Sequence, residues 1–484
     1  MDIVFSTFNA RYSHTALALR CLRANLGSLH ERSTIVEFDN SLSPQAAAEK
    51  LLAHDPKIVL FSVYIWNLTV TAETTAILRT VRPELKIIIG GPEVSYEYDN
   101  LTLFRTADHL ICGEGEAVVE PLCRDLLVGK ALPKVIDAPP ADLKTIALPY
   151  DEYTADDIAH RRIYVETSRG CPFHCEYCLS ALDEAVRFFP PERIFQEFEK
   201  LIECGVRIFK FLDRSFNINA AHAAAVLRFF LENRRDGMML HLEWEPEHLP
   251  PTLEKLIAEA PPGFLQLEVG VQTFNPEISK RINRSLDADK VEAHIRTLAA
   301  MPSVHLHADL IAGLPGETLE SIAAGFDRLH ACGPNEIQLG ILKKLRGAPI
   351  AKHDVEWQMV YNTSPPYDVL QTAALSFIEL QQLRRFARYW DIIVNNGRFP
   401  ETSKLIWQNQ PSVFGAFMEW SIWIYEQTHT TFGFTPARLA QLLEAFLTGT
   451  RVLNAKTVRH AIDTDLAARS AGAKGMERQT RKKS

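Results

Sequence analysis

Residues 168–181 read SRGCPFHCEYCLSA and place Cys171, Cys175 and Cys178 within eight positions. Spacers of three and two residues are too short for a helix or a strand to run between the cysteines. A structural zinc site needs four ligands, usually from two separated segments, so His174 would have to complete it. A 4Fe–4S cluster has four irons that are each normally held by one thiolate. Three thiolates leave one iron open, and the spacing therefore favours a catalytic cluster over zinc.

The cysteine loop follows the first of six strand-like segments between residues 162 and 345. These segments are RIYVETS, RIFKFLD, LHLEWE, FLQLEVGVQ, VHLHADLIAG and EIQLGIL, with helical patterns between them. Strands that alternate with helices predict a parallel sheet. Six β/α units are too few for a closed eight-stranded barrel, so we expect a partial TIM-type (β/α)6 barrel. Such folds carry their active sites at the carboxyl ends of the strands, where the cysteine loop begins.

Other regions flank this barrel on both sides. Residues 1–130 hold five strand-like segments separated by helical patterns, which predicts an α/β, doubly wound, Rossmann-like domain. Residues 131–161 contain Pro133, Pro139, Pro140 and Pro149 and are interpreted as a linker. Helical patterns dominate residues 346–468, which predicts a helical C-terminal region. Residues 469–484 are basic and lack apolar periodicity, which predicts a disordered tail.

The composition restricts the class of protein. The 484 residues are 46% hydrophobic and 23% charged, with a formal net charge of −8, which gives no electrostatic footprint for nucleic acid. No segment has the length and apolarity of a membrane-spanning helix, and MDIVFSTFNARYSH lacks the pattern of a signal peptide. Eight cysteines without a secretory signal indicate a cytoplasmic protein that uses them for metal binding or catalysis.

The cysteine loop resembles the signature of the radical SAM superfamily, C-x3-C-x2-C with an aromatic residue, here Tyr177, before the last cysteine. The resemblance implies that Cys171, Cys175 and Cys178 hold three irons of a 4Fe–4S cluster. It implies that the fourth iron chelates the amino and carboxylate groups of S-adenosylmethionine. Cofactor contacts are also implied at the ends of later strands. Their candidates are Tyr177, Asp213, Arg214, Glu268 and Gln272.

A doubly wound domain ahead of this barrel resembles the cobalamin domain of the cobalamin-binding (class B type) radical SAM branch. Gly90 and Gly91 of GGPEVSY would let the backbone approach a large flat ligand. SVYIWN adds Ser62 and Trp66 as candidate cobalamin contacts, although Trp66 could instead be a core residue. The Asp-x-His-x-x-Gly motif that commonly ligates cobalt is absent after the first strand. His14 of FNARYSHTAL is the one candidate to take its place.

Polar residues occupy every second position of several barrel strands and therefore share a face of the sheet. Helices that covered this face would bury charge, so we place it inside the barrel, where it predicts a polar substrate. The candidates for substrate contact are Glu243, His305 and His307. His305 and His307 could instead form part of a second metal site.

The resemblance implies an enzyme that methylates an unactivated carbon of a polar small molecule. A 5′-deoxyadenosyl radical would remove a hydrogen atom, and methylcobalamin would supply the methyl group. The implied partner is an electron donor such as flavodoxin or ferredoxin; a membrane or nucleic acid partner is not expected.

Other functions are compatible with parts of this pattern. A cobalamin-dependent rearrangement, cyclisation or ring contraction needs the same cofactors without methyl transfer. A methylthiotransferase would use Cys21, Cys112 and Cys123 for a second cluster, but Cys21 and Cys123 lie inside helical patterns. A non-catalytic cobalamin or SAM sensor would have no need of an open iron.

Overall fold

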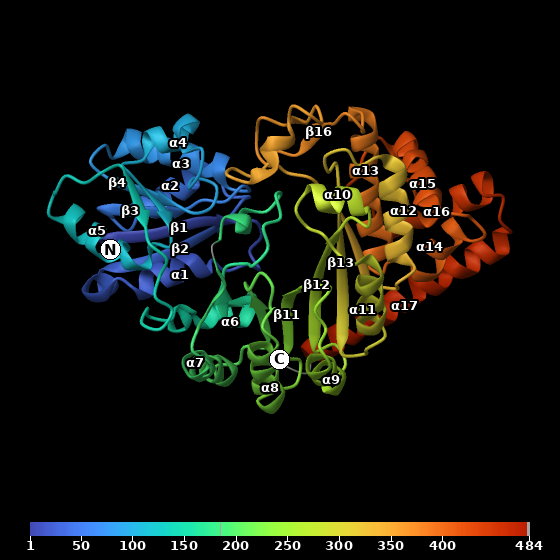
Figure 1. The fold of residues 1–484 in the computed structure, drawn as a ribbon, viewed down its shortest axis with the longest axis horizontal. Helices are drawn as coiled ribbons and strands as arrows, with labels where there is room; N and C mark the ends of the chain where they lie inside the picture. The colour runs from blue at the N-terminus through green and yellow to red at the C-terminus, as the bar shows by residue number, and fades with distance from the viewer. Residues whose placement is uncertain (184, 482–484) are drawn as a thin grey trace.

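The computed structural model describes residues 1–183 and 185–481, which form two parallel sheets and a helical region along the chain (Figure 1). The first sheet has six parallel strands in the order β2-β1-β3-β4-β5-β6, and its helices lie on both faces. Its elements are β1 (Ile3–Asn9), α1 (Leu17–Ala24), β2 (Ser33–Asp39), α2 (Pro44–Leu52), β3 (Ile58–Ser62), α3 (Leu68–Val81), β4 (Lys86–Gly90), α4 (Thr102–Thr106), β5 (His109–Gly113), α5 (Val119–Leu127) and β6 (Val135–Ala138). The Rossmann-like domain is thereby confirmed.

The central strands of this sheet form because their residues are apolar on both faces. Every residue of β1 and β3 is buried, as expected for parallel strands with helices on either side. One apolar core lies under α2 and α3, and the other lies under α1 and α5. The sixth strand, β6, falls inside the predicted linker, which also contains α6 (Ala155–His160). Three of its four residues are half-buried and one is exposed at the sheet edge, so they give little apolar signal.

The second sheet also has six parallel strands, in the order β14-β13-β12-β11-β10-β7. Neighbours in the chain are neighbours in the sheet, and β7 and β14 remain unpaired to each other, which confirms the open six-unit barrel. Its elements are β7 (Ile163–Val165), α7 (Pro191–Glu203), β10 (Ile208–Phe211), α8 (Ala220–Glu232), β11 (Met239–Trp244), α9 (Pro251–Glu259), β12 (Leu265–Gln272), α10 (Pro276–Arg281), α11 (Ala288–Ala299), β13 (Val304–Ala312), α12 (Leu319–His330) and β14 (Glu336–Ile341).

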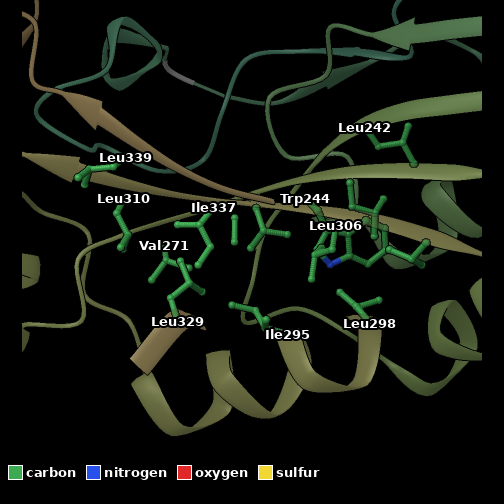
Figure 2. Close-up of a cluster of buried hydrophobic side chains, with 14 of the residues drawn as sticks. Leu242, Trp244, Val271, Ile295, Leu298, Leu306, Leu310, Leu329, Ile337 and Leu339 are labelled. Carbon is green, nitrogen blue, oxygen red and sulfur yellow. The ribbon is translucent and has the colours of Figure 1, made fainter. Parts of the chain in front are cut away.

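The barrel strands have one apolar face and one polar face. In β12 the residues alternate between buried and half-buried along its whole length. Figure 2 shows the apolar face: Leu306 and Leu310 of β13 and Ile337 of β14 pack with Ile295 of α11 and Leu329 of α12. The helices therefore cover the apolar side, and the polar residues of these strands point the other way, into the barrel.

The C-terminal region packs on the β14 edge of the barrel (Figure 1). It contains β15 (Val360–Tyr361), β16 (Val369–Gln371), α13 (Phe377–Trp390), α14 (Pro400–Trp407), α15 (Val413–Thr428), α16 (Pro436–Ala445) and α17 (Ala455–Arg481). The helix α17 runs into the segment from residue 469, for which disorder was expected, and ends at Arg481; disorder of that segment in solution stays a prediction. The segment AGAKGMERQTR consists mostly of good helix formers, a local preference that needs no apolar periodicity. Residues 482–484 lie outside the described residues.

None of the helices within the described residues combines the length and the apolar composition that crossing a bilayer requires.

The turn after β4 generates a prediction about stability. Gly91 has φ +108°, and a Cβ at this position would lie 2.6 Å from the carbonyl oxygen of Val63. Gly205 has nearly the same φ, +103°, with nothing within 4 Å of a Cβ. We expect Gly205→Ala to lower the free energy of unfolding by about 1–2 kcal/mol, from the left-handed backbone alone.

Gly91→Ala should lower it by at least twice as much, because the added methyl group also displaces the backbone of β3. Urea unfolding of both variants measures the difference. Equal losses in the two variants would show that the turn can relax around a side chain.

Candidate active site

The cysteine loop leaves the barrel after β7, and a two-residue antiparallel ladder closes its base. The ladder pairs β8 (Ser168–Arg169) with β9 (Arg187–Phe188). Gly170 turns the chain out of the ladder with φ +93°, and a Cβ there would lie 2.3 Å from the carbonyl oxygen of Ala185. Glycine is therefore required at the start of the loop.

Cys171, Cys175 and Cys178 line one cavity of about 260 Å³ at the carboxyl ends of the strands, here called the barrel cavity. Its other lining residues are Phe173, Tyr177, Ser180, Arg214, Ser215, Glu243, Trp244, Glu245, Glu268, Gly270, Gln272, Arg284 and Asp309. Among the described residues, three donor atoms that all lie within 4.8 Å of one another are found at His305, His307 and Glu336 and not at the three cysteines. The cysteine sulfurs are thus more widely spaced than zinc ligands, and His174 is engaged with the carbonyl oxygen of Ala181 at 3.1 Å.

Arg284 brings positive charge to the cysteine loop from the segment that follows α10. Its Nη1 donates to Sγ of Cys175 at 3.5 Å, and its Nη2 donates to the carbonyl oxygen of Gly270 at 2.5 Å. Glu245 lies 3.4 Å from the same guanidinium. Arg284 thus places a buried positive charge beside the cysteine loop. Arg284 could not be predicted from the sequence, because a lone arginine in INRS does not differ from a surface arginine.

Residues 349–353, which follow the barrel in the chain, also contact the cysteine loop. Glu176, between the second and third cysteines, is ion-paired with Lys352 and accepts a hydrogen bond from Nε2 of His353 at 2.6 Å. Its carbonyl oxygen accepts from the amide of Ile350 at 2.8 Å. The short 3₁₀ turn Pro349–His353 therefore fixes the loop that carries the cysteines.

Asp213 and Arg214 follow β10 side by side but have different surroundings. Asp213 is buried behind the loop, where it accepts hydrogen bonds from the hydroxyls of Thr167 and Ser168, both at 2.6 Å. Burial raises the pKa of Asp213 to about 6. Asp213 does not line the barrel cavity, and its cofactor contact stays a prediction. Arg214 does line the cavity, 3.6 Å from Glu243.

The wall opposite the cysteines is acidic and contains Glu243, Glu268 and Asp309. Burial raises the pKa of Glu243 to about 7, and burial, with repulsion from the other two carboxylates, raises the pKa of Asp309 to about 7. Burial opposes ionisation of Glu268 as well, but His241, whose Nε2 lies 2.6 Å away, lowers the pKa of Glu268 to about 2. Oδ1 of Asp309 has no hydrogen-bond partner among the described residues. A buried acceptor without a partner fits a ligand that donates a hydrogen bond there.

Gln272 reaches the barrel cavity because β12 ends in an irregularity. The pairing of β12 with β13 shifts register between Gly270 and Gln272, and Gln272 adopts φ +70°. Its side-chain amide then lies over Gly270, where a Cβ would be only 2.3 Å from it. The predicted position of Gln272 on the inner face is retained, at the rim of the cavity.

His305 and His307 do not line the barrel cavity, which corrects their grouping with Glu243. They stand near the amino end of β13, where His305 is 46% exposed. Alternation along a strand identifies the face on which a residue lies but not its depth along the barrel. Both histidines do face inward, yet at the end opposite the cysteines.

A second cavity, of about 410 Å³, lies between the first domain and the barrel and is here called the interdomain cavity. The first domain contributes the strand ends of β3, β4 and β5, and the barrel contributes the end of β7 and the cysteine loop. Its lining residues include Ser62, Tyr64, Gly90, Gly91, Tyr96, Gly113, Glu114, Glu116, Glu166, Arg169, Leu179, Ser180 and Asp183. The predicted contacts Ser62, Gly90 and Gly91 are therefore brought together.

Trp66 and His14 lie outside the lining of the interdomain cavity. Trp66 is 47% exposed, stacks on Tyr64 with ring centroids 4.5 Å apart, and donates from Nε1 to the carbonyl oxygen of Phe8. Trp66 therefore packs on the ring of Tyr64 from the solvent-exposed side. Nδ1 of His14 lies 2.5 Å from the hydroxyl of Tyr164, and burial lowers the pKa of His14.

The two cavities meet at the cysteine loop. Ser180, two residues after Cys178, lines both of them. Leu212 lines the interdomain cavity, whereas Arg214, two residues later in the same strand end, lines the barrel cavity. A ligand of the first domain and a ligand of the cysteines would thus face each other across this loop.

Three family profiles match consecutive parts of the chain. The B12 binding domain matches residues 5–122, the radical SAM superfamily matches residues 165–329, and a protein family of unknown function, DUF4080, matches residues 355–480. The chain is a cobalamin-binding radical SAM protein. These two domains imply three cofactors, namely a 4Fe–4S cluster, S-adenosylmethionine and cobalamin.

Curated relatives of this radical SAM protein are distant. An uncharacterized methyltransferase of Pyrococcus horikoshii is 25% identical over 336 residues, covering 64% of this chain and 71% of the relative. The cobalamin-dependent radical SAM methyltransferase TokK of Streptomyces tokunonensis is 24% identical, covering 60% and 47%. A tRNA-2-methylthio-N(6)-dimethylallyladenosine synthase of Jannaschia sp. is 26% identical, covering 53% and 56%. The match spans about half the length of the last two relatives.

A solved structure has the same fold over most of the chain. The radical S-adenosylmethionine methyltransferase TsrM of Kitasatospora setae, with tryptophan substrate and a SAM analog bound, superposes with a TM-score of 0.62 at 16% identity. The superposition covers 78% of this chain and 80% of TsrM. At this sequence identity the similarity shows a shared fold only.

The residues present fit the three cofactors of a cobalamin-binding radical SAM protein. Three cysteines at one cavity could hold three irons of the cluster. The cation Arg284 and the unpartnered Asp309 could hold the polar groups of S-adenosylmethionine. The glycines of the interdomain cavity expose backbone to a large flat ligand, as cobalamin requires.

The acidic wall generates a prediction about pH. A carboxyl group whose pKa is raised in the folded state stabilises the fold below its ordinary pKa, and this contribution is lost as the pH rises through about 7. Asp309→Asn removes the group that titrates. The free energy of unfolding of the variant minus that of wild type should therefore increase between pH 5 and pH 8, by on the order of 1–3 kcal/mol.

Thermal melts of the SAM-free protein at both pH values measure this difference. The exposed Asp55, changed to Asn, is the control and should leave the difference flat. A stability difference for Asp309→Asn that shrinks toward pH 8 would contradict the burial of a charge at this wall.

Proposed function

We propose that this radical SAM enzyme methylates an unactivated carbon of a polar small molecule, with cobalamin as the methyl carrier. The observation that carries the proposal is the adjacency of the two cavities at Ser180. Methyl transfer to a substrate radical needs the hydrogen-abstracting group and the methyl donor on either side of one carbon. The cysteine loop separates the two ligand sites by only the short segment around Ser180, which supports such an arrangement. The methyltransferases among the distant relatives support the same reaction class.

The cofactors supply the radical and the methyl group, and the chain supplies position and protection from water. We infer that Cys171, Cys175 and Cys178 ligate the cluster, with Arg284 balancing the charge on its thiolate side. Glu243, which shares a wall with Arg214, is the proposed substrate contact. A carboxyl with a pKa of about 7 can donate or accept a hydrogen bond near neutral pH.

We infer that residues 342–371, the segment after β14 that is here called the strap, close the barrel cavity and the interdomain cavity. Arg346 of this segment lies 3.1 Å from the carboxylate of Glu93 in the first domain, and Tyr367 donates to the same carboxylate at 2.7 Å. Figure 1 shows the segment around β16 spanning from the helical region toward the first domain. It therefore covers the junction of the two domains and excludes water from a radical.

The methylthiotransferase alternative requires a second cluster on three cysteines of the first domain. Cys21 packs in the core that continues into the barrel, Cys123 packs in the core under α1 and α5, and Cys112 contacts the opposite face of the sheet. Cys112 bonds to the carbonyl oxygen of Ser95 at 3.7 Å. The three thiols are thus dispersed, and we do not propose this function.

Labelled S-adenosylmethionine tests the proposal. Reduced protein with its cluster and cobalamin is incubated with a polar metabolite extract and S-adenosylmethionine whose methyl group is deuterated. We expect 5′-deoxyadenosine, S-adenosylhomocysteine and a metabolite that has gained the deuterated methyl group, with about four irons per chain. 5′-Deoxyadenosine with an altered but unlabelled metabolite would contradict methylation and favour a rearrangement.

Matched cysteine variants control this experiment. Cys171→Ser should abolish the iron chromophore and 5′-deoxyadenosine formation, whereas Cys204→Ser, at an exposed cysteine, should leave both unchanged. About eight irons per chain would revive the second-cluster alternative.

A prediction about cobalt follows from the position of His14. Because His14 contacts Tyr164 and does not line the interdomain cavity, it should not coordinate the metal. The electron paramagnetic resonance spectrum of the cob(II)alamin form should show no nitrogen splitting from a protein ligand. His14→Ala should retain stoichiometric cobalamin and an unchanged spectrum. Nitrogen splitting that disappears in this variant would overturn the assignment.

A further inference from the structure

A second group of metal-ligating side chains lies at the end of the barrel opposite the cysteines. His305, His307 and Glu336 each offer one ligand atom, and the three atoms lie within 4.8 Å of one another. Nε2 of His305 is 2.8 Å and Nε2 of His307 is 3.2 Å from Oε1 of the same glutamate. Two imidazole nitrogens and a carboxylate oxygen converge here on one point.

The strand register produces this convergence. His305 and His307 are two positions apart on β13, so they project from the same face. Glu336 is the first residue of β14 and pairs directly with His307. The group is therefore built from backbone positions that the sheet fixes, not from flexible loops. It also joins β13 to β14, which is the edge strand of the open barrel.

The surroundings resemble those of a metal site more than those of an ordinary barrel interior. Nδ1 of His307 lies 3.0 Å from the side-chain amide nitrogen of Gln338; with this amide turned by 180°, its oxygen accepts from Nδ1–H and leaves Nε2 unprotonated for a metal ion. The amide nitrogen of Gln266 lies 3.2 Å from Nε2 of His307, and a metal ion on this nitrogen would displace that contact. Apolar branched residues would be usual at such positions.

The spacing of the three donor atoms is compatible with a metal ion after a small adjustment. Tetrahedral zinc with bonds of about 2.0–2.1 Å separates its ligand atoms by about 3.3 Å. The contact of His305 with Glu336 is shorter than this, and His305 is half-exposed, so its ring can swing outward. The same exposure gives an ion access from solvent, whereas His307 is nearly buried and already oriented.

We propose that His305, His307 and Glu336 bind one divalent transition metal ion of the zinc class. The ion would fasten the amino end of edge strand β14 to β13 and so stabilise the open side of the barrel. Two histidines and one carboxylate are a common ligand set for zinc. This site is separate from the cysteine cluster and goes beyond the proposed methyl transfer.

Equilibrium dialysis of the untagged protein, with its cluster assembled, against buffered Zn²⁺ tests the site. Mass spectrometry then counts zinc and iron per chain. We expect about one zinc alongside about four irons. His305→Ala and Glu336→Gln should lose the zinc and keep the iron. Gln338→Leu keeps all three ligands and should weaken zinc binding by about 10–100-fold.

The histidine–carboxylate pair of His160 and Asp156 provides the control, because it has a similar contact but no third donor. His160→Ala should bind zinc as wild type does. Zinc should also raise the melting temperature of wild type and of this control, but not of His305→Ala. If wild type binds no stoichiometric zinc, or if His305→Ala binds as much as wild type, the group is only a hydrogen-bonded cluster. Iron content and 5′-deoxyadenosine formation report separately on the proposed function.

Discussion

The ion-pair network of Arg169 holds the cysteine loop against the first domain, and the rest of the site depends on it. Arg169 lies two residues before Cys171 and is within 2.9 Å of Glu114 and Glu116 of the first domain and of Glu166 at the end of β7. The carboxylates around the guanidinium raise the pKa of Arg169 and keep it charged, although burial opposes the charge. Removal of one member of such a buried network typically costs about 3–5 kcal/mol. The two cavities share a wall because this network joins the two domains at that point.

A second set of contacts fixes the same loop from the C-terminal side. Glu176 is held by His353, and Glu93 of the first domain is held by Arg346 and Tyr367. The segment after β14 thus connects the cysteine loop, the barrel edge and the cobalamin domain. The helical region that follows packs through α13 against both β14 and β16, at the two ends of this segment.

The fold could be predicted from the sequence for two reasons. Strands of the first domain that are buried on both faces give continuous apolar runs, and from residue 162 six strand-like segments alternate with helical patterns, with the cysteine loop after the first. The loop itself could be predicted because three cysteines at this spacing have few other uses. The position of His305 and His307 along the barrel axis could not be predicted, because alternation every two residues identifies the face of a strand but not the position along it. The sequence also could not show that Trp66 lies outside the lining of the interdomain cavity, where it stacks on Tyr64. Arg284 and Arg169 were missed because their partners are distant in sequence and only folding brings them together.

We propose that the cluster and cobalamin lie in adjacent cavities on either side of the loop at Ser180. Electron paramagnetic resonance of protein that carries both the reduced cluster and cob(II)alamin tests it most directly, since two unpaired spins that are close together couple through space. The account predicts that each signal is split or broadened when both centres are paramagnetic and becomes simple when either one is made diamagnetic. Two independent signals, unchanged by the state of the other centre, would contradict a shared chamber.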